Sequence, residues 1–125
     1  MMILKLDFDS DEALYSQLIH QIIYGIAAGE IREGDSLPSV RQVADTIRIN
    51  MHTVNKAYAI LRQEGYLKLD RRRGAVICLN SDKEEMIRQL QNELGRTIAK
   101  AICKGISREE LHQLVDAVYL SFMNS

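Results

Sequence analysis

Apolar side chains recur at helical spacing near the beginning of the chain, from Leu14 through Ile26. Ser10 is a suitable N-cap before them, and Gly29 suits the left-handed position that follows many helices. We therefore predict a first helix over residues 11–28.

A polar connection over residues 30–36 leads to a second, shorter helix. Pro38 forces the residue before it to be extended and so separates the connection from this helix. Ser39 followed three positions later by Gln42 has the form of a capping box. We predict a helix over residues 40–47.

A third helix follows after Asn50, which is a good N-cap, and Gly65 ends it. It is predicted over residues 51–63. Its apolar stripe consists of Val54, Ala57, Tyr58 and Leu61. Because only residues 48–49 separate the second helix from this cap, the two helices indicate a helix-turn-helix.

The pattern then changes to two short runs typical of strands, over residues 66–70 and 75–79. Residues 71–74 lie between them with the sequence Arg-Arg-Arg-Gly, in which the glycine suits a tight turn. A hairpin with a basic tip directly after a helix-turn-helix predicts a wing.

The remaining chain predicts two more helices, one from residue 82 to Gly105 and one that begins with a capping box of Ser107 and Glu110. Both carry an apolar stripe. The stripes comprise Ile87, Leu90, Leu94, Ile98, Leu111, Leu114, Val115, Val118 and Phe122. A two-helix hairpin has too little surface to bury both stripes, so we predict a homodimer formed through them, with burial of the last helix's stripe.

These elements predict a mainly α fold with a small β wing (α+β). A winged helix-turn-helix over residues 1–79 would be followed by a two-helix dimerisation segment over residues 80–125. Of the 125 residues, 46% are apolar, which is ordinary for a globular protein. The first residues lack the apolar core of a signal peptide, and no run is long enough for a membrane span, so we expect a cytoplasmic protein without a membrane partner.

The net charge of −1 conceals an uneven distribution. Residues 1–35 hold two basic and seven acidic side chains, whereas residues 36–74 hold eight basic and three acidic ones. A basic block in an otherwise acidic chain suits contact with a polyanion, although an ordinary solvated basic face has the same composition.

The sequence indicates no catalytic centre. His20, His52 and His112 share no spacing typical of metal ligands. Cys78 and Cys103 stand in apolar runs that favour buried free thiols, with a disulfide or a metal site as the alternative. We expect no enzymatic activity, no catalytic or metal-binding residues and no cofactor. A small-molecule effector stays an open alternative, without candidate residues.

The first turns of the third helix carry the candidate residues for contact with double-stranded DNA. His52 and Asn55 can hydrogen-bond base edges, Thr53 can contact a phosphate or a thymine methyl group, and Lys56 suits a phosphate or a guanine. A solvated polar face at the beginning of a helix is the alternative.

Further candidates lie at the beginning of the second helix and in the wing. Arg41 stands in a first turn, where the helix dipole disfavours cations, so an external anion would account for it. An arginine that packs its stem along the surface is the alternative. We include Ser39 beside it. Arg71, Arg72, Arg73 and Gly74 could follow a neighbouring groove or the DNA backbone.

Four segments in this order resemble the GntR family of bacterial regulators. They are LYSQL (14–18), GEIREGDSLPSVR (29–41), TVNKAY (53–58) and LRQEGYL (61–67). The short C-terminal part resembles the YtrA-like subfamily. The resemblance implies a dimeric repressor that binds a palindromic operator, often that of a transporter operon.

Carried over by position, the family's DNA contacts fall on Arg41, His52, Thr53, Asn55 and the wing around Arg73 and Gly74. The chain departs from the family pattern at three positions. Arg48 stands where a glycine is usual in the turn, Arg72 replaces the first glycine of the wing tip, and Ala13 replaces a proline. The alternative function is a winged helix that binds an acidic protein instead of an operator.

Overall fold

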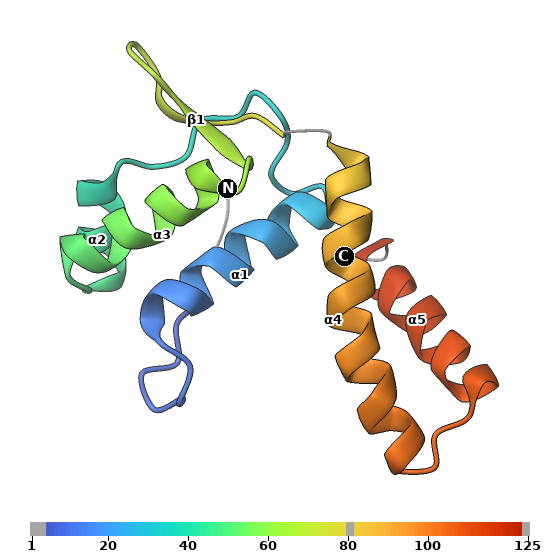
Figure 1. The fold of residues 1–125 in the computed structure, drawn as a ribbon. Coiled ribbons are helices and arrows are strands. Elements are labelled where there is room, and N and C mark those ends of the chain that lie inside the picture. Colours follow the sequence, from blue (N-terminus) through green and yellow to red (C-terminus); the bar gives the residue numbers. More distant parts are fainter. Residues whose placement is uncertain (1–4, 80–81, 124–125) are drawn as a thin grey trace. The chain divides into compact units, whose positions relative to one another are not determined.

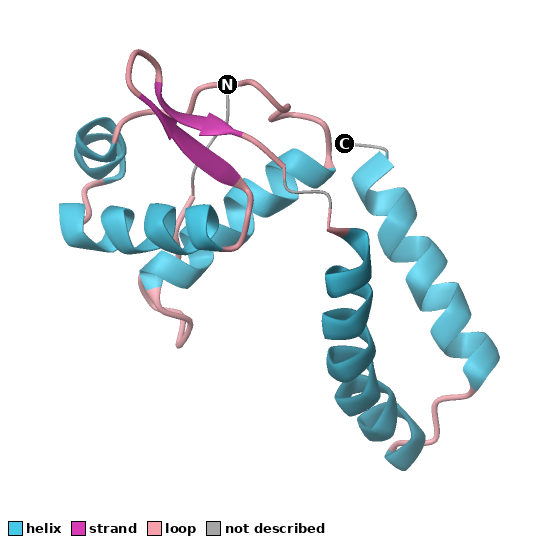
Figure 2. Ribbon diagram, turned by 45° about the horizontal axis from the view of Figure 1, so that its top comes forward, coloured by secondary structure: helices cyan, strands magenta, loops and turns pink. Residues whose placement is uncertain are grey.

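The computed structural model describes residues 5–79 and 82–123. By internal contacts the chain divides into two units, Met1–Asn80 and Ser81–Ser125, and each is described by itself. The first unit contains α1 (Leu14–Ala27), α2 (Val40–Ile47), α3 (Met51–Gln63), β1 (Leu67–Asp70) and β2 (Gly74–Ile77) (Figure 1). The second contains α4 (Lys83–Cys103) and α5 (Arg108–Met123). The mainly α fold with a two-stranded wing is therefore confirmed (Figure 2).

The helix-turn-helix agrees with the sequence prediction at both ends of both helices. The Ser39 hydroxyl accepts a hydrogen bond from the Gln42 amide at 3.1 Å, and the Gln42 side chain accepts one from the Ser39 amide at 2.9 Å. Asn50 caps α3 by accepting from the amide of His52 at 2.7 Å. These bonds satisfy amides that a helix leaves without partners, which explains why the boundaries are visible in the sequence.

The turn between the two helices holds one residue in an unusual conformation. Arg48 has φ 58°, and it is the only non-glycine residue with positive φ in residues 5–79 and 82–123. The following amide, of Ile49, donates to the carbonyl of Ala44 at 3.1 Å and so closes the end of α2. The left-handed conformation costs an L-residue about 1–2 kcal/mol, which the surrounding packing must offset.

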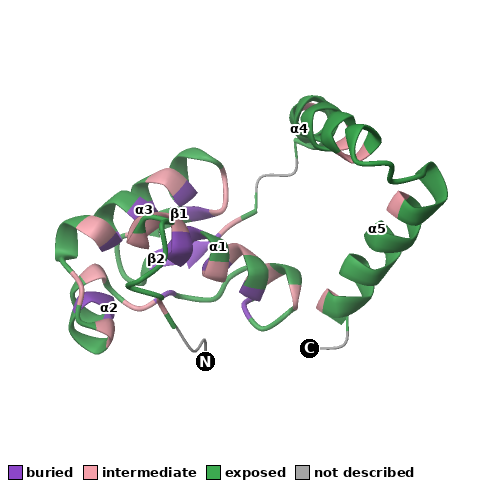
Figure 3. Cartoon of the chain, turned by 90° about the horizontal axis from the view of Figure 1, so that it is seen from below, coloured by how far each residue is buried: buried purple, intermediate pink, exposed green. Residues whose placement is uncertain are grey.

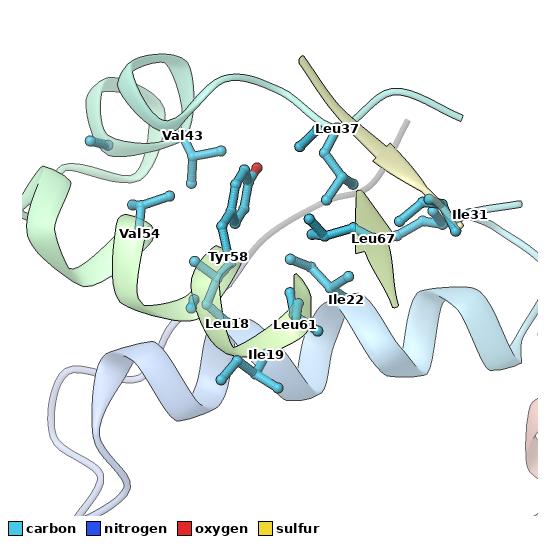
Figure 4. Packing of buried hydrophobic residues seen from close by; sticks show 14 residues of the cluster. Leu18, Ile19, Ile22, Ile31, Leu37, Val43, Val54, Tyr58, Leu61 and Leu67 are labelled. Carbon is cyan, nitrogen blue, oxygen red and sulfur yellow. The ribbon is translucent and has the colours of Figure 1, made fainter. Parts of the chain in front are cut away.

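The core of the first unit lies where α1 crosses α3 beneath the wing (Figure 4). Its largest fully buried side chains come from α1, α3 and β2. They are Leu18, Ile22, Val54, Leu61 and Ile77. Each contributes about 1.5–3 kcal/mol through burial, so this unit holds its fold with its own side chains.

The connection between α1 and α2 does more than the polar link predicted from its composition. Ile31 and Leu37 are buried in the core. The Leu37 amide donates to the carbonyl of Ala75, and the Ile77 amide to that of Asp35, both at 2.8 Å. Residues 35–37 thus lie against the free edge of β2, with Ser36 bridged to Val76. The prediction was incomplete because this pairing joins segments about 40 positions apart in sequence.

The first helix begins later than predicted, at Leu14. Ser10 does not cap it; its hydroxyl accepts from the amide of Glu12 at 3.1 Å within the preceding turns. The buried Gln17 amide group donates to the carbonyls of Asp7 and Glu12 at 2.9 and 2.8 Å. These bonds hold residues 7–12 outside the helix. At the other end, Gly29 has φ +80°, as its predicted position after the helix requires.

Both strands are shorter than predicted. Tyr66 lies before β1, with its amide bonded to the carbonyl of Leu61 at 2.9 Å as part of the helix end. The ladder runs from Leu67 opposite Ile77 to Asp70 opposite Gly74. Gly74, predicted to lie in the turn, is the first residue of β2, with φ +75°.

The second unit is a helical hairpin, and its described helices contain no buried residue (Figure 3). The predicted Ser107–Glu110 capping box is present, with bonds of 3.0 and 3.1 Å. The apolar stripes are present but uncovered: Leu94 is 48% exposed and Val118 is 55% exposed. The expectation that the last helix buries its stripe is therefore wrong for the single chain, since even Leu111 and Phe122 are only half-buried.

The cysteine prediction is correct in part. Both thiols are free, but Cys78 is half-buried and Cys103 is exposed on α4. The apolar run around Cys103 belongs to a helix that has no core beneath it, so the run did not indicate burial. Within the described residues, no helix is long and apolar enough to cross a membrane.

Candidate nucleic-acid interface

The outer face of α3 presents polar side chains at its N-terminal end. His52 and Asn55 are exposed, and Met51 beside them is 43% exposed. Val54, Ala57 and Leu61 are buried on the opposite side of the helix. The core therefore fixes the rotation of α3 so that His52 and Asn55 face solvent.

The electrostatics of this helix end favour an anion. The first turn of α3 contains no acidic residue, and Asn50 engages the His52 amide. The Thr53 and Val54 amides donate to the Asn50 carbonyl, so the positive charge at this N-terminus comes mainly from the helix dipole. A phosphate or an electronegative base edge would be stabilised there.

Thr53 and Lys56 differ from the other candidates on α3. Thr53 is half-buried, at the side of the helix. The Lys56 ammonium lies 3.9 Å from the centroid of the Tyr15 ring on α1, a cation–π contact. Such a contact contributes about 0.5–1 kcal/mol at an exposed site. Lys56 therefore has a partner within the chain, which the sequence pattern did not reveal, because α1 and α3 are far apart in sequence.

The beginning of α2 carries Ser39 and Arg41, both exposed. The Ser39 hydroxyl accepts from Gln42, so its own proton can still be donated to an external acceptor. The Tyr58 hydroxyl donates to the carbonyl of Pro38 at 2.6 Å, which attaches α3 to the residue before the N-cap of this helix. Burial raises the pKa of Tyr58 to about 12, so the hydroxyl stays a donor at neutral pH.

The wing tip is held by the side chain of Asp70. Its Oδ1 accepts from the amides of Arg72 at 2.8 Å and Arg73 at 3.1 Å. These two hydrogen bonds, aided by the charges of Arg73 and Lys68, hold the pKa of Asp70 below its ordinary value. The Arg73 guanidinium donates to the carbonyl of Gly34 in the connection before α2.

Arg71 and Arg72 are exposed. Within the described part of the chain, neither guanidinium has a hydrogen bond, ion pair or cation–π contact. The three arginines, equivalent in the sequence, thus differ in the structure.

Residues 34–38 join the three parts of the candidate interface. They pair with β2 of the wing, receive the Tyr58 hydrogen bond from α3 and lead directly into the cap of α2. The starts of α2 and α3 and the wing are therefore fixed relative to one another. In the described residues, no group of three or more His, Cys, Asp or Glu side chains could hold a metal ion.

Comparison with known proteins places this geometry in a family. The sequence profile of the bacterial regulatory proteins of the gntR family matches residues 14–77. The chain is 32% identical over 118 residues to the HTH-type transcriptional repressor YtrA of Bacillus subtilis, covering 92% of this chain and 91% of that protein.

Two solved structures are similar. The YtrA protein of Sulfolobus acidocaldarius, a GntR-family transcription factor, is 38% identical with a TM-score of 0.62, covering 76% of this chain and 96% of that one. A structure described as a transcriptional antiterminator from Listeria monocytogenes EGD-e is 25% identical with a TM-score of 0.85, covering 97% and 92%. The resemblance seen in the sequence is confirmed. The chain belongs to the gntR family of bacterial regulatory proteins and is a DNA-binding transcription regulator.

Proposed function

We propose that the protein is a homodimeric repressor that binds a palindromic operator with one α3 helix in the major groove of each half-site. The observation that carries this proposal is the N-terminal face of α3. His52 and Asn55 are exposed there, on the side opposite a fully buried stripe. In a helix-turn-helix, residues at this position reach the base edges.

The remaining predicted contacts have separate roles in this proposal. Arg41 and Ser39 bind the phosphate backbone beside the half-site, or Arg41 contacts a guanine edge. Thr53 contacts a phosphate or a thymine methyl group at the edge of the helix. The wing residues Arg71 and Arg72 add sequence-independent attraction to the backbone. Lys56 contributes charge near the DNA, although Tyr15 already engages its ammonium group.

The dimer forms through α4 and α5. Their uncovered stripes include Leu90 at 40%, Leu94 at 48% and Leu114 at 54% exposure. A second copy offers an identical apolar surface, and a two-fold axis would place two α3 helices on one DNA duplex. The palindromic operator follows from this symmetry.

The repressor activity and the transporter-type target operon rest on similarity. The B. subtilis relative is named a transcriptional repressor and matches nearly the full length of this chain. The YtrA-like resemblance implies operons of this kind. The protein would therefore bind at a promoter and block transcription of transporter genes.

The test begins by selecting binding sites from random duplex DNA with the purified full chain. We expect enrichment of an inverted repeat with half-sites about 10 base pairs or a multiple apart. An enriched pool without two-fold symmetry would contradict the dimeric proposal. If no sequence is enriched over the starting pool, the proposal of operator recognition is wrong.

Variants then separate reading from positioning. Asn55→Ala and His52→Ala are expected to change which bases are preferred, with a loss of about 1–3 kcal/mol in discrimination at each contacted base. Arg41→Ala should weaken operator binding by about 1–3 kcal/mol. Gln63→Ala, an exposed change at the other end of α3, is the control. If the two α3 variants keep the operator-to-random ratio of the parent, α3 is not the reading element.

A further inference from the structure

The wing of this protein has a basic tip in which the three arginines are not equivalent. Arg71, Arg72 and Arg73 are adjacent and exposed, and by composition each could bind a phosphate. Only the Arg73 guanidinium is engaged within the described chain, through its hydrogen bond to the Gly34 carbonyl.

The bond joins Arg73, at the beginning of β2, to a residue that pairs with the end of β2. Arg73 directly precedes β2, whereas the Gly34 amide donates to the carbonyl of Ile77, the last residue of that strand, at 2.8 Å. The Arg73 side chain therefore runs back along β2 toward the base of the wing. Its charge lies away from the tip, where Arg71 and Arg72 remain.

The backbone of the same residue is fixed from the other side. Asp70, the last residue of β1, accepts hydrogen bonds from the amides of both Arg72 and Arg73. Asp70 thus closes the turn, and Arg73 attaches the closed turn to the connection before α2. A two-stranded hairpin alone is marginally stable in water, so contacts to the rest of the unit decide how well this tip is ordered.

We propose that Arg73 is a positioning residue, which clamps the wing to the connection before α2 and thereby presents Arg71 and Arg72 to the DNA backbone. This inference rests on the proposed function and assigns different roles within its wing. Arg73 acts through the order of the tip, and Arg71 and Arg72 supply the phosphate contacts.

The first test uses the free protein. Arg73→Met keeps the length of the side chain but removes its charge and its donors. We expect the ¹⁵N heteronuclear NOE of residues 71–74 to fall in Arg73→Met and to stay at the parent value in Arg71→Met, the matched control. An unchanged NOE in Arg73→Met overturns the proposal.

The second test is a cycle of DNA-binding measurements on random duplex DNA at several low salt concentrations. Arg73→Met should weaken binding by roughly threefold to fivefold in the parent, the size expected when the exposed charged contacts of Arg71 and Arg72 are weakened. In the Arg71→Met/Arg72→Met background it should cost less than about twofold, because the contacts that it positions are already lost.

Two results together overturn the proposal. One is an equal loss of affinity on Arg73→Met in both backgrounds, and the other is a decrease of about 0.9 in the magnitude of the slope of log K against log salt concentration in each. They would identify Arg73 as a direct phosphate contact. If the unsubstituted chain binds no duplex DNA, the proposed function fails, and the NOE comparison still decides whether Arg73 clamps the wing.

Discussion

The two units of this chain use their apolar residues in opposite ways. In the N-terminal unit, Leu18, Ile22 and Leu61 are completely buried within one chain. In the C-terminal unit, the described helices have no buried residue, although Leu94 and Val118 belong to apolar stripes at helical spacing. Regular spacing therefore predicts which face of a helix is apolar, but not whether the same chain covers it.

The difference indicates that the two units have different roles. A unit with its own core can hold the DNA-contacting side chains in fixed positions, whereas a hairpin with uncovered stripes needs another surface to become stable. If a second copy supplies that surface, the stability of the C-terminal unit depends on protein concentration and that of the N-terminal unit does not.

The largest expected effect comes from placing a charge on the uncovered stripe. Leu94→Glu would bury one carboxylate from each chain in the proposed interface and weaken dimerisation by about 4 kcal/mol or more, roughly a thousandfold. Light scattering at micromolar concentration should show half of the parent mass. Asn92→Glu places the same charge on the opposite side of α4 and should leave the mass unchanged. A dimeric Leu94→Glu protein would exclude this stripe from the interface.

The next effect lies in the core of the first unit. Leu61→Ala removes a completely buried side chain and should lower the free energy of unfolding by about 3 kcal/mol. Chemical denaturation would measure the loss, which should be the same at low and high protein concentration. Leu69→Ala makes the same change at a leucine that is 62% exposed and should cost less than about 0.5 kcal/mol. Equal losses would contradict the assignment of the core.

The sequence predicts features that depend on residues close together in the chain, and it misses features that depend on contacts between distant residues. The starts of α2 and α3 were predictable because Ser39, Gln42 and Asn50 cap them through bonds to residues two or three positions away. The late start of α1 was not, because Gln17 holds a segment whose contacts reach back ten positions.

The candidate site shows the same limit. The exposure of His52 and Asn55 follows from the period of α3 and was predictable. The contact of Lys56 with Tyr15 and the hydrogen bond of Arg73 to Gly34 join segments that are far apart in the chain. Such contacts leave no periodic pattern in the sequence. The pairing of residues 35–37 with β2 was missed for the same reason, since the pattern of three residues is too short to show a strand.

A smaller effect concerns the bond that attaches α3 to the beginning of α2. Tyr58→Phe keeps the buried ring but leaves the Pro38 carbonyl without this donor, so it should cost about 1 kcal/mol of stability. It should also weaken operator binding, because Ser39 follows directly after Pro38 and Arg41 lies in the first turn of the helix that begins there. Denaturation and operator titration would measure the two effects. Tyr66→Phe, at a half-buried tyrosine outside this contact, is the control. Unchanged values for Tyr58→Phe would show that the bond does not position α2.

The smallest expected effect is on the free energy of unfolding, and it concerns the left-handed backbone conformation of Arg48. Arg48 has φ 58°, a conformation that glycine adopts without steric cost. Arg48→Gly should therefore raise the free energy of unfolding by roughly 0.5 kcal/mol, the relief of strain less the greater entropy of an unfolded glycine. Arg48→Ala removes the same charge but keeps the strain, so it should not stabilise the protein. Chemical denaturation of both variants separates the contribution of backbone strain to stability from that of the Arg48 charge. If alanine stabilises as much as glycine, charge repulsion rather than the left-handed backbone is the source of the strain at this turn.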